Sequence, residues 1–136
     1  MSWPIFQRWF NVAPQANAKY FTDNQGEKIW ISWSDRSEEM SRLYSRHRGY
    51  PAGMVTFIKE DKDLLTLADI HVTQNYRHRG IGKGLMQEAL KWARKNNFRK
   101  IKGLMMGHDG ISEEYIREWY KRQGFHVTGR QISLEL

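Results

Sequence analysis

Apolar and polar positions alternate with period two in several segments of the chain, and these segments predict strands. Residues 28–34 ("KIWISWS") alternate and are rich in β-branched and aromatic side chains. Residues 52–72 contain two apolar runs on either side of the charged turn "KEDKD", which is typical of a β-hairpin. Residues 100–107 and the C-terminal "FHVTGRQISLEL" add further strand patterns. The period-two pattern therefore predicts several strands, which we expect to form a sheet.

Three other segments follow the helical period. Residues 37–48 ("SEEMSRLYSRHR") predict a short helix with Ser37 as its N-cap. Residues 82–95 predict a longer helix, whose buried stripe is Leu85, Met86, Ala89, Leu90 and Ala93. A last helix begins near Ser112, whose hydroxyl can cap it, and stops at Gly124. Helices that follow strands after a central hairpin predict a mixed α/β sheet.

The first 28 residues differ from the remainder of the chain. They begin with aromatic residues near helical spacing, namely Trp3, Phe6, Trp9 and Phe10. We interpret these as a face packed on the domain, and the polar, turn-rich stretch that follows as a loop. At 136 residues the chain is long enough for one domain. The predicted organisation is therefore an N-terminal segment, residues 1–28, and a domain, residues 29–136.

Composition narrows the classes of function. The formal net charge is +7, which favours an anionic partner such as nucleic acid, a membrane surface or a phosphate-bearing small molecule. The chain has no cysteine, which excludes disulfides, zinc–thiolate sites and a cysteine nucleophile. No apolar run approaches the roughly 20 residues of a membrane span, and "MSWPIFQRWF" lacks the features of a signal peptide. We therefore expect a cytoplasmic protein without a membrane partner.

A basic, glycine-rich turn lies where the strand ending at Val72 gives way to the helix of residues 82–95. Its distinctive residues are Arg77, His78, Arg79, Gly80, Gly82, Lys83 and Gly84. The backbone N–H groups of a helix's first turn have no intrahelical partner, and the helix dipole favours negative charge there. Glycines permit close approach of a phosphate, and basic side chains add charge around it. The turn therefore predicts a phosphate site and favours a pyrophosphate.

Two common phosphate-binding patterns do not fit this turn. A P-loop would continue from Gly82-Lys83 with serine or threonine, but Gly84 follows. A dinucleotide fingerprint needs G-x-G-x-x-G and an acidic residue about 20 positions later. Here the glycines are spaced G-x-G-x-G, and the corresponding region, "KNNFRKIKG", holds no acidic residue.

The segment "IHVTQNYRHRGIGKGLMQEAL" resembles the acyl-coenzyme A motif of the GNAT family of N-acetyltransferases, in which a strand runs into Q/R-x-x-G-x-G/A. Arg77, Gly80 and Gly82 match the defined positions. The resemblance implies a GNAT-like acyl-coenzyme A N-acyltransferase fold, an α+β arrangement with a mostly antiparallel sheet. The sheet would splay between the family's fourth and fifth strands, the fourth being the strand that ends at Val72.

The segment "EEYIREWYKRQGF" is similar to the family's second motif, N-x-x-A-x-x-L-Y-x-x-x-G-F. The matching positions are Tyr120, Gly124 and Phe125. The departures are Glu113, Ile116 and Trp119, in place of asparagine, alanine and leucine. The two similar segments together span about residues 64–125, in the family's order.

The resemblance implies acetyl transfer from acetyl-coenzyme A, as cosubstrate and without a metal, to a primary amine. Backbone N–H groups from Arg79 to Gly84, including that of Ile81, would hold the pyrophosphate, with Arg77, His78 and Lys83 around them. The main chain of Val72 would pair with the pantetheine arm, and the N–H of Ile70 would polarise the thioester carbonyl. Tyr120 would protonate the departing thiolate.

The general base remains open in this pattern. An amine with a pKa near 10.4 must lose a proton before it attacks, and without a cysteine the attack is direct, in a ternary complex. Asp69 and His71 share one face of their strand and are candidates. Where some family members carry a glutamate, this chain has Thr66. The other candidates are Glu113, Glu114 and a chain of water molecules.

Two other functions compete with this interpretation. A nucleic-acid-binding module could use the basic residues between 77 and 102 with the interleaved aromatics Tyr76 and Trp92. An inactive coenzyme A sensor could keep the same fold. We consider nucleic acid the weaker interpretation, because the charge lies where a coenzyme's phosphates would need it. The identity of the amine acceptor is not selected by any pattern, and a homodimer is an expectation from the family and from the exposed aromatic residues.

Overall fold

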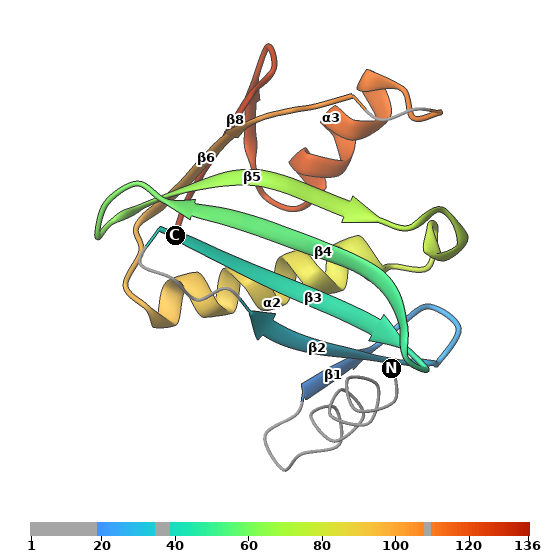
Figure 1. The fold of residues 1–136 in the computed structure, drawn as a ribbon. Helices are drawn as coiled ribbons and strands as arrows, with labels where there is room; N and C mark the ends of the chain where they lie inside the picture. The colour runs from blue at the N-terminus through green and yellow to red at the C-terminus, as the bar shows by residue number, and fades with distance from the viewer. Residues whose placement is uncertain (1–18, 35–38, 108–109) are drawn as a thin grey trace, which may run out of the picture.

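The computed structural model describes residues 19–34, 39–107 and 110–136. In these residues eight strands form one sheet in the order β1-β2-β3-β4-β5-β6-β8-β7, packed with two longer helices, α2 and α3 (Figure 1). The elements are β1 Lys19–Thr22, β2 Lys28–Ser34, β3 Met40–His47, β4 Tyr50–Lys59, β5 Leu64–Val72, η1 Gln74–Tyr76, α2 Ile81–Lys95, β6 Lys100–Leu104, α3 Glu113–Arg122, β7 His126–Thr128 and β8 Gln131–Glu135.

The sheet is antiparallel at every junction except β5–β6, which confirms the predicted mixed, mostly antiparallel fold. β5 and β6 pair only from Leu64 with Lys100 to Leu67 with Gly103. An irregularity in the β4–β5 register leaves Ala68 without a partner on β4 immediately afterwards. Beyond that point β6 diverges from β5 (Figure 1), and α3 contacts β7. The predicted splay is therefore present, and the second half of β5 has an open edge.

Helix α2 forms where the sequence predicted it, because its apolar residues recur on one face. That face is fully covered at Leu85, Met86 and Ala89, and it contacts β3, β4 and β5. Trp92, on the same helix, packs against the rings of Trp33 and Phe98 with centroid separations of 4.5 and 5.6 Å. Neither α2 nor α3, the longer helices of the described residues, has the length and apolar character of a membrane span.

The helix predicted at residues 37–48 is wrong, because residues 40–47 form strand β3. Its side chains alternate strictly, with Ser41, Leu43 and Ser45 buried and the residues between them only half-buried. This period-two pattern outweighs the helical spacing of its apolar residues, since β3 pairs with β2 on one side and β4 on the other. The proposed cap, Ser37, lies outside the described residues.

The loop predicted before residue 28 is also wrong in part. Residues 19–22 form β1, which pairs with β2 from Lys19 with Ile31 to Thr22 with Lys28. The turn between the two strands is stabilised by Asp23, whose carboxylate accepts hydrogen bonds from the N–H groups of Gln25 and Glu27. The aromatic stripe of residues 3–10 lies outside the described residues.

Candidate functional site

The opening between β5 and β6 leads into a cavity of about 750 Å³. It extends from the open half of β5, past residues 73–80, which we call the Gly80 turn, to α3. Of the predicted site residues, those that line it are Asp69, Ile70, His71, Val72, Arg77, His78, Gly80, Ile81, Gly82, Lys83 and Tyr120. Arg79 and Gly84 are absent from its lining. Segments that are far apart in the sequence therefore meet at one cavity.

The open edge of β5 presents backbone groups to this cavity. The N–H of Thr73 donates to the carbonyl of Ala52 on β4 over 3.0 Å. Because backbone groups alternate along an extended chain, those of Val72 and Ile70 point to the opposite side, away from β4. The carbonyl of Val72 accepts a hydrogen bond from Nε of Arg77 at 3.4 Å. An extended ligand could add to this edge as a further strand does.

The start of α2 provides N–H groups for an anion. Gly80 is the N-cap and has φ +79°, in the left-handed region that favours glycine. The first intrahelical bond runs from the N–H of Gly84 to the carbonyl of Gly80 over 3.0 Å. The N–H groups of the three residues between them, Ile81, Gly82 and Lys83, precede that first bond and have no helical partner. No acidic residue occupies this first turn, so its positive dipole end is not neutralised there.

Gly84 does not have the role that the sequence suggested. Its N–H is already used within the helix, and it is buried. A Cβ at this position would overlap the ring of Phe21 on β1. Gly84 therefore lets β1 approach α2 closely and contributes no N–H group to an anion site.

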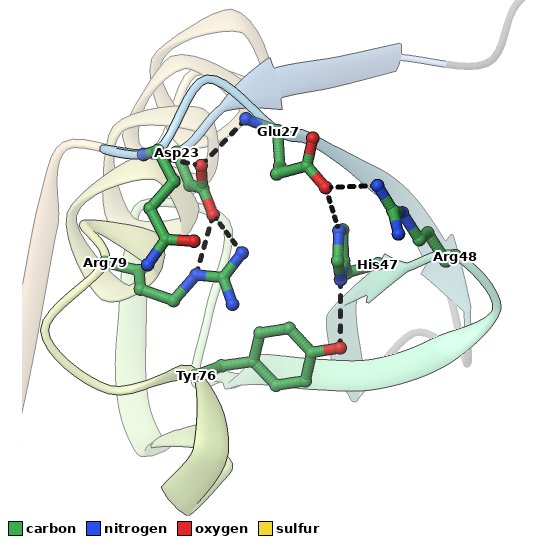
Figure 2. Close-up of polar contacts among 7 residues, drawn as sticks. Asp23, Glu27, His47, Arg48, Tyr76 and Arg79 are labelled. Atoms are coloured by element: carbon green, nitrogen blue, oxygen red, sulfur yellow. Dashed lines mark hydrogen bonds and ion pairs between the residues drawn. The ribbon is translucent and has the colours of Figure 1, made fainter.

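The sequence also suggested that the side chain of Arg79 adds positive charge around a phosphate, and the structure corrects this. Its guanidinium donates from Nε and Nη2 to one carboxylate oxygen of Asp23, over 2.8 and 2.7 Å (Figure 2). The Asp23 side chain is fully buried and that of Arg79 is 16% exposed. This ion pair faces the β1–β2 turn, so the guanidinium is not directed at an anion in the cavity. Arg77, His78 and Lys83 remain as the cationic or protonatable side chains at the basic end of the cavity.

Helix α3 closes the other side of the cavity. Its N-cap is Ser112, as predicted, whose hydroxyl accepts from the N–H of Tyr115 at 3.1 Å. The ring of Tyr115 contacts that of His78 edge-on, with centroids 6.3 Å apart. One turn later the indole of Trp119 lies beside Gly82, as does the side chain of Val72. Contacts of α3 with both the Gly80 turn and α2 therefore narrow the cavity between them.

Tyr120 is held firmly in the wall of the cavity. It is only 6% exposed, and its ring packs edge-on against Trp119 and Phe125, with centroids 5.1 and 5.4 Å away. Burial raises the pKa of Tyr120 to about 12, and the negative charge of Asp69 adds to the effect. The phenol is therefore protonated at neutral pH and is able to donate a proton.

The base candidates occupy different positions. Asp69 and His71 both line the cavity, Asp69 half-buried and His71 exposed. Glu113 and Glu114 do not line it. Their carboxylates pair on the surface, Glu113 with Arg130 at 3.2 Å and Glu114 with Arg117 at 3.1 Å. Of these four residues, only the two on β5 line the cavity.

Sequence reasoning missed a polar network behind the Gly80 turn (Figure 2). His47 on β3 contacts the hydroxyl of Tyr76 through Nδ1 and the carboxylate of Glu27 through Nε2, both at 3.0 Å. Arg48 pairs with the same carboxylate at 2.7 Å. These contacts join three segments that lie far apart in the chain, and no local motif signals them. The sequence predicted only a turn-rich loop before residue 28, and not its contact with residues 76–79.

Taken together, an open strand edge and a helix N-terminus without a side-chain cap are features of a site for an extended ligand that carries an anionic group at one end. The model of the Acetyltransferase (GNAT) family matches residues 3–125 of the chain. The chain therefore belongs to the GNAT acetyltransferase family.

Two curated relatives are similar in sequence. An uncharacterized N-acetyltransferase from Methanocaldococcus jannaschii is 27% identical over 112 residues, which are 78% of this chain and 48% of the relative. Streptothricin acetyltransferase A from Bacillus subtilis is 23% identical over 111 residues, 80% of this chain and 62% of the relative. The chain thus spans between about half and three fifths of the length of these relatives.

Solved structures share the fold. The GNAT domain of S. lividans PAT covers 88% of this chain and 97% of its own length, with a TM-score of 0.71 at 10% identity. A GNAT family acetyltransferase from Elizabethkingia anophelis, solved with acetyl-CoA bound, covers 75% of this chain and 85% of its own, with a TM-score of 0.64 at 15% identity. At these identities the likeness concerns the fold.

Proposed function

We propose that this chain transfers an acetyl group from acetyl-coenzyme A to a primary amine by direct attack within a ternary complex. The observation that carries the proposal is one cavity that combines the open edge of β5, the free N–H groups at the start of α2 and the buried phenol of Tyr120. A related fold has been solved with acetyl-CoA bound. The described geometry has room and polar groups for such a donor.

The donor would bind along the cavity in an extended form. Its diphosphate would accept hydrogen bonds from the N–H groups of residues 81–83, next to Arg77, His78 and Lys83. Its pantetheine arm would follow the open edge of β5, where Val72 presents its main chain. The N–H of Ile70, on the same edge, would donate to the thioester oxygen as negative charge develops there.

Tyr120 would act as the general acid. When the amine attacks the thioester carbon and the C–S bond breaks, the leaving sulfur carries negative charge. A thiol has a pKa near 8.5, well below the value of about 12 for Tyr120, so the phenol is protonated whenever the thiolate forms. Proton donation in the transition state assists departure even when full transfer is uphill, and a resulting phenolate would be reprotonated from solvent.

Asp69 and His71 are the proposed bases for the amine. Both line the cavity on β5, one on each side of Ile70 in the sequence. Either could take the proton directly or through one water molecule. Replacing each separately, Asp69→Asn and His71→Gln, distinguishes them, because loss of the true base lowers kcat and moves the acidic limb of the pH–rate profile.

The test is a screen for thiol release. Acetyl-coenzyme A is incubated with the protein and with a panel of amines and peptides, and the free thiol is measured. Acceptor-dependent release by at least one amine supports the proposal. If coenzyme A binds but no amine in a broad panel promotes release, the chain is better described as a coenzyme A sensor.

The nucleic-acid alternative receives less support from the described residues. Trp92, one of the two aromatics offered for base stacking, packs against Trp33 and Phe98. Tyr76 packs against the ring of His47 and the guanidinium of Arg79. Both rings are thus occupied by contacts within the domain, and a single strand would need other platforms.

A further inference from the structure

Both ends of the β1–β2 turn are linked to the Gly80 turn. At one end, Asp23 pairs with Arg79 through two short hydrogen bonds. At the other end, Glu27 reaches Tyr76 through His47. The backbone is joined as well, since the N–H of Asn24 donates to the carbonyl of Arg79 over 2.8 Å. The Gly80 turn therefore rests on a second turn, and neither is an independent loop.

Asp23 is the centre of this arrangement. Its buried carboxylate accepts from two N–H groups of its own turn through one oxygen and from Arg79 through the other. Burial alone would raise the pKa of Asp23, but the hydrogen bonds from Glu27 and Arg79 outweigh it and hold the pKa below its ordinary value. The group stays ionised, which suits a permanent partner of a guanidinium.

The fit around Gly80 is tight. A Cβ on Gly80 would lie 2.7 Å from the side-chain oxygen of Asn24, which is adjacent to Asp23. The guanidinium of Arg79 also lies over the ring of Tyr76, 5.0 Å from its centroid. Arg79 thus contacts Tyr76 within the Gly80 turn and is fixed by Asp23, immediately before the N–H groups that begin α2.

We propose that Asp23 is a positioning residue for the diphosphate-binding backbone: through Arg79 it fixes the Gly80 turn so that the first N–H groups of α2 converge on one anion. This inference rests on the proposed function. It gives the unexpected Arg79 ion pair a role, because an anion site made of N–H groups depends on a rigid backbone more than on one further positive side chain.

The test compares Asp23→Asn with the wild-type chain. An asparagine keeps an oxygen for the N–H groups of Gln25 and Glu27, but turns an NH₂ group toward the donors of Arg79. The turn should therefore survive while its link to Arg79 is lost. We expect the dissociation constant of coenzyme A, measured by calorimetry, to rise by about tenfold.

Pantetheine separates positioning from general damage, because it shares the arm of coenzyme A but lacks the diphosphate. Its affinity, measured at the higher concentration that a fragment requires, should change by less than about twofold in Asp23→Asn. An equal loss for pantetheine and coenzyme A would mean that the substitution merely loosens the domain, and would overturn the proposal.

Asp61→Asn is the matched control. Asp61 also stabilises a turn between two strands, accepting from the N–H groups of Asp63 and Leu64 over 2.7 and 2.9 Å. It lies at the β4–β5 turn and does not line the cavity. This variant should bind coenzyme A as the wild-type chain does.

Arg79→Lys carries the test if Asp23→Asn does not fold. A lysine keeps the charge but cannot make the two-pronged contact, so the affinity for coenzyme A should again fall while that for pantetheine holds. Unchanged affinity for coenzyme A in a folded variant of either residue would overturn the proposal and leave the proposed function intact. A wild-type chain that binds no coenzyme A would instead remove the proposed function itself.

Discussion

At the scale of single residues, the environment of Tyr120 determines the chemistry available to the cavity. Trp119 and Phe125 enclose its ring, and Asp69 adds an unfavourable charge for a phenolate. Both effects favour the neutral phenol, so the same packing that buries the side chain also keeps its proton. A residue in this state can serve as an acid but not as a base at neutral pH.

Tyr120→Phe removes the hydroxyl and retains the ring packing. We expect kcat to fall by about two orders of magnitude, within the range of general acid catalysis, while the affinity for coenzyme A is retained. Steady-state kinetics and calorimetry measure the two quantities. Tyr50→Phe is the control, since Tyr50 is 68% exposed and does not line the cavity. Turnover by Tyr120→Phe equal to that of the control would remove Tyr120 from the mechanism.

The raised pKa of Tyr120 also predicts a dependence of stability on alkaline pH. In the unfolded chain the phenol ionises near its ordinary pKa of 10, and in the folded chain near about 12. The contribution of this group is fully present below pH 10 and is lost as the pH rises through that interval. At about pH 11 the wild-type chain should have lost roughly 1 kcal/mol more than Tyr120→Phe, each relative to neutral pH.

Urea titrations of the two proteins at neutral and alkaline pH provide the comparison. Taking the difference between them cancels the other tyrosines and lysines, which ionise in both. Parallel loss of stability in the two proteins would show that the phenol of Tyr120 is not desolvated in the folded state.

At the scale of elements, β1 approaches α2 closely where the ring of Phe21 lies against Gly84. Alanine in place of glycine normally stabilises a helix interior by up to about 1 kcal/mol. Gly84→Ala should instead destabilise the domain by about 1–3 kcal/mol, because the new methyl group overlaps the ring. Urea unfolding measures this change.

A variant that lacks the ring of Phe21 is the control in which to repeat the Gly84→Ala substitution. In Phe21→Ala the space beside Gly84 is vacant, so adding Gly84→Ala should be neutral or stabilising there. An equal cost in both backgrounds would mean that Phe21 does not limit this position.

The elements that the sequence predicted correctly are those with one dominant signal. Helix α2 has a continuous apolar stripe, α3 has a capping serine, and β5 lies in a clear hairpin pattern. β3 was misassigned because "SEEMSRLYSRHR" fits both periods, and only pairing with β2 and β4 decides between them. β1 is four residues long and mostly exposed, so it carries little apolar pattern.

The residues of the candidate site also fall into two groups, those that the sequence could predict and those that it could not. Ile70, Val72 and the start of α2 follow from contiguous motifs, and the structure brings them to one cavity. The partner of Arg79 could not be predicted, because Asp23 is 56 positions away in the sequence. The packing role of Gly84 could not be predicted either, because it depends on the ring of Phe21 on β1. Local patterns predict candidate backbone anion sites, whereas the residues that would support them come from tertiary contacts.

At the scale of the whole molecule, the formal charge of +7 is distributed among different roles. Arg79 is neutralised by Asp23, and Arg117 is paired with the acidic start of α3. The basic end of the cavity keeps Arg77 and Lys83 next to the helix N-terminus. A compact dianion should therefore bind better than an extended polyanion.

This difference predicts a selective thermal shift. In low-salt buffer, acetyl-coenzyme A should raise the melting temperature by several degrees, and an oligonucleotide of equal phosphate concentration should have a smaller effect. The shift from acetyl-coenzyme A should persist when salt is raised moderately. A larger shift from the oligonucleotide, with steep salt dependence, would favour the nucleic-acid alternative.

In the proposed complex, backbone N–H groups at the start of α2 bind the diphosphate of coenzyme A. Amide NMR of the ¹⁵N-labelled chain, titrated with coenzyme A, follows each of these groups separately. We expect saturable shifts of the amides of Ile81, Gly82 and Lys83, with the amide of Asp61 unchanged. If the amides of residues 81–83 stay unmoved at millimolar coenzyme A, these groups do not bind the diphosphate.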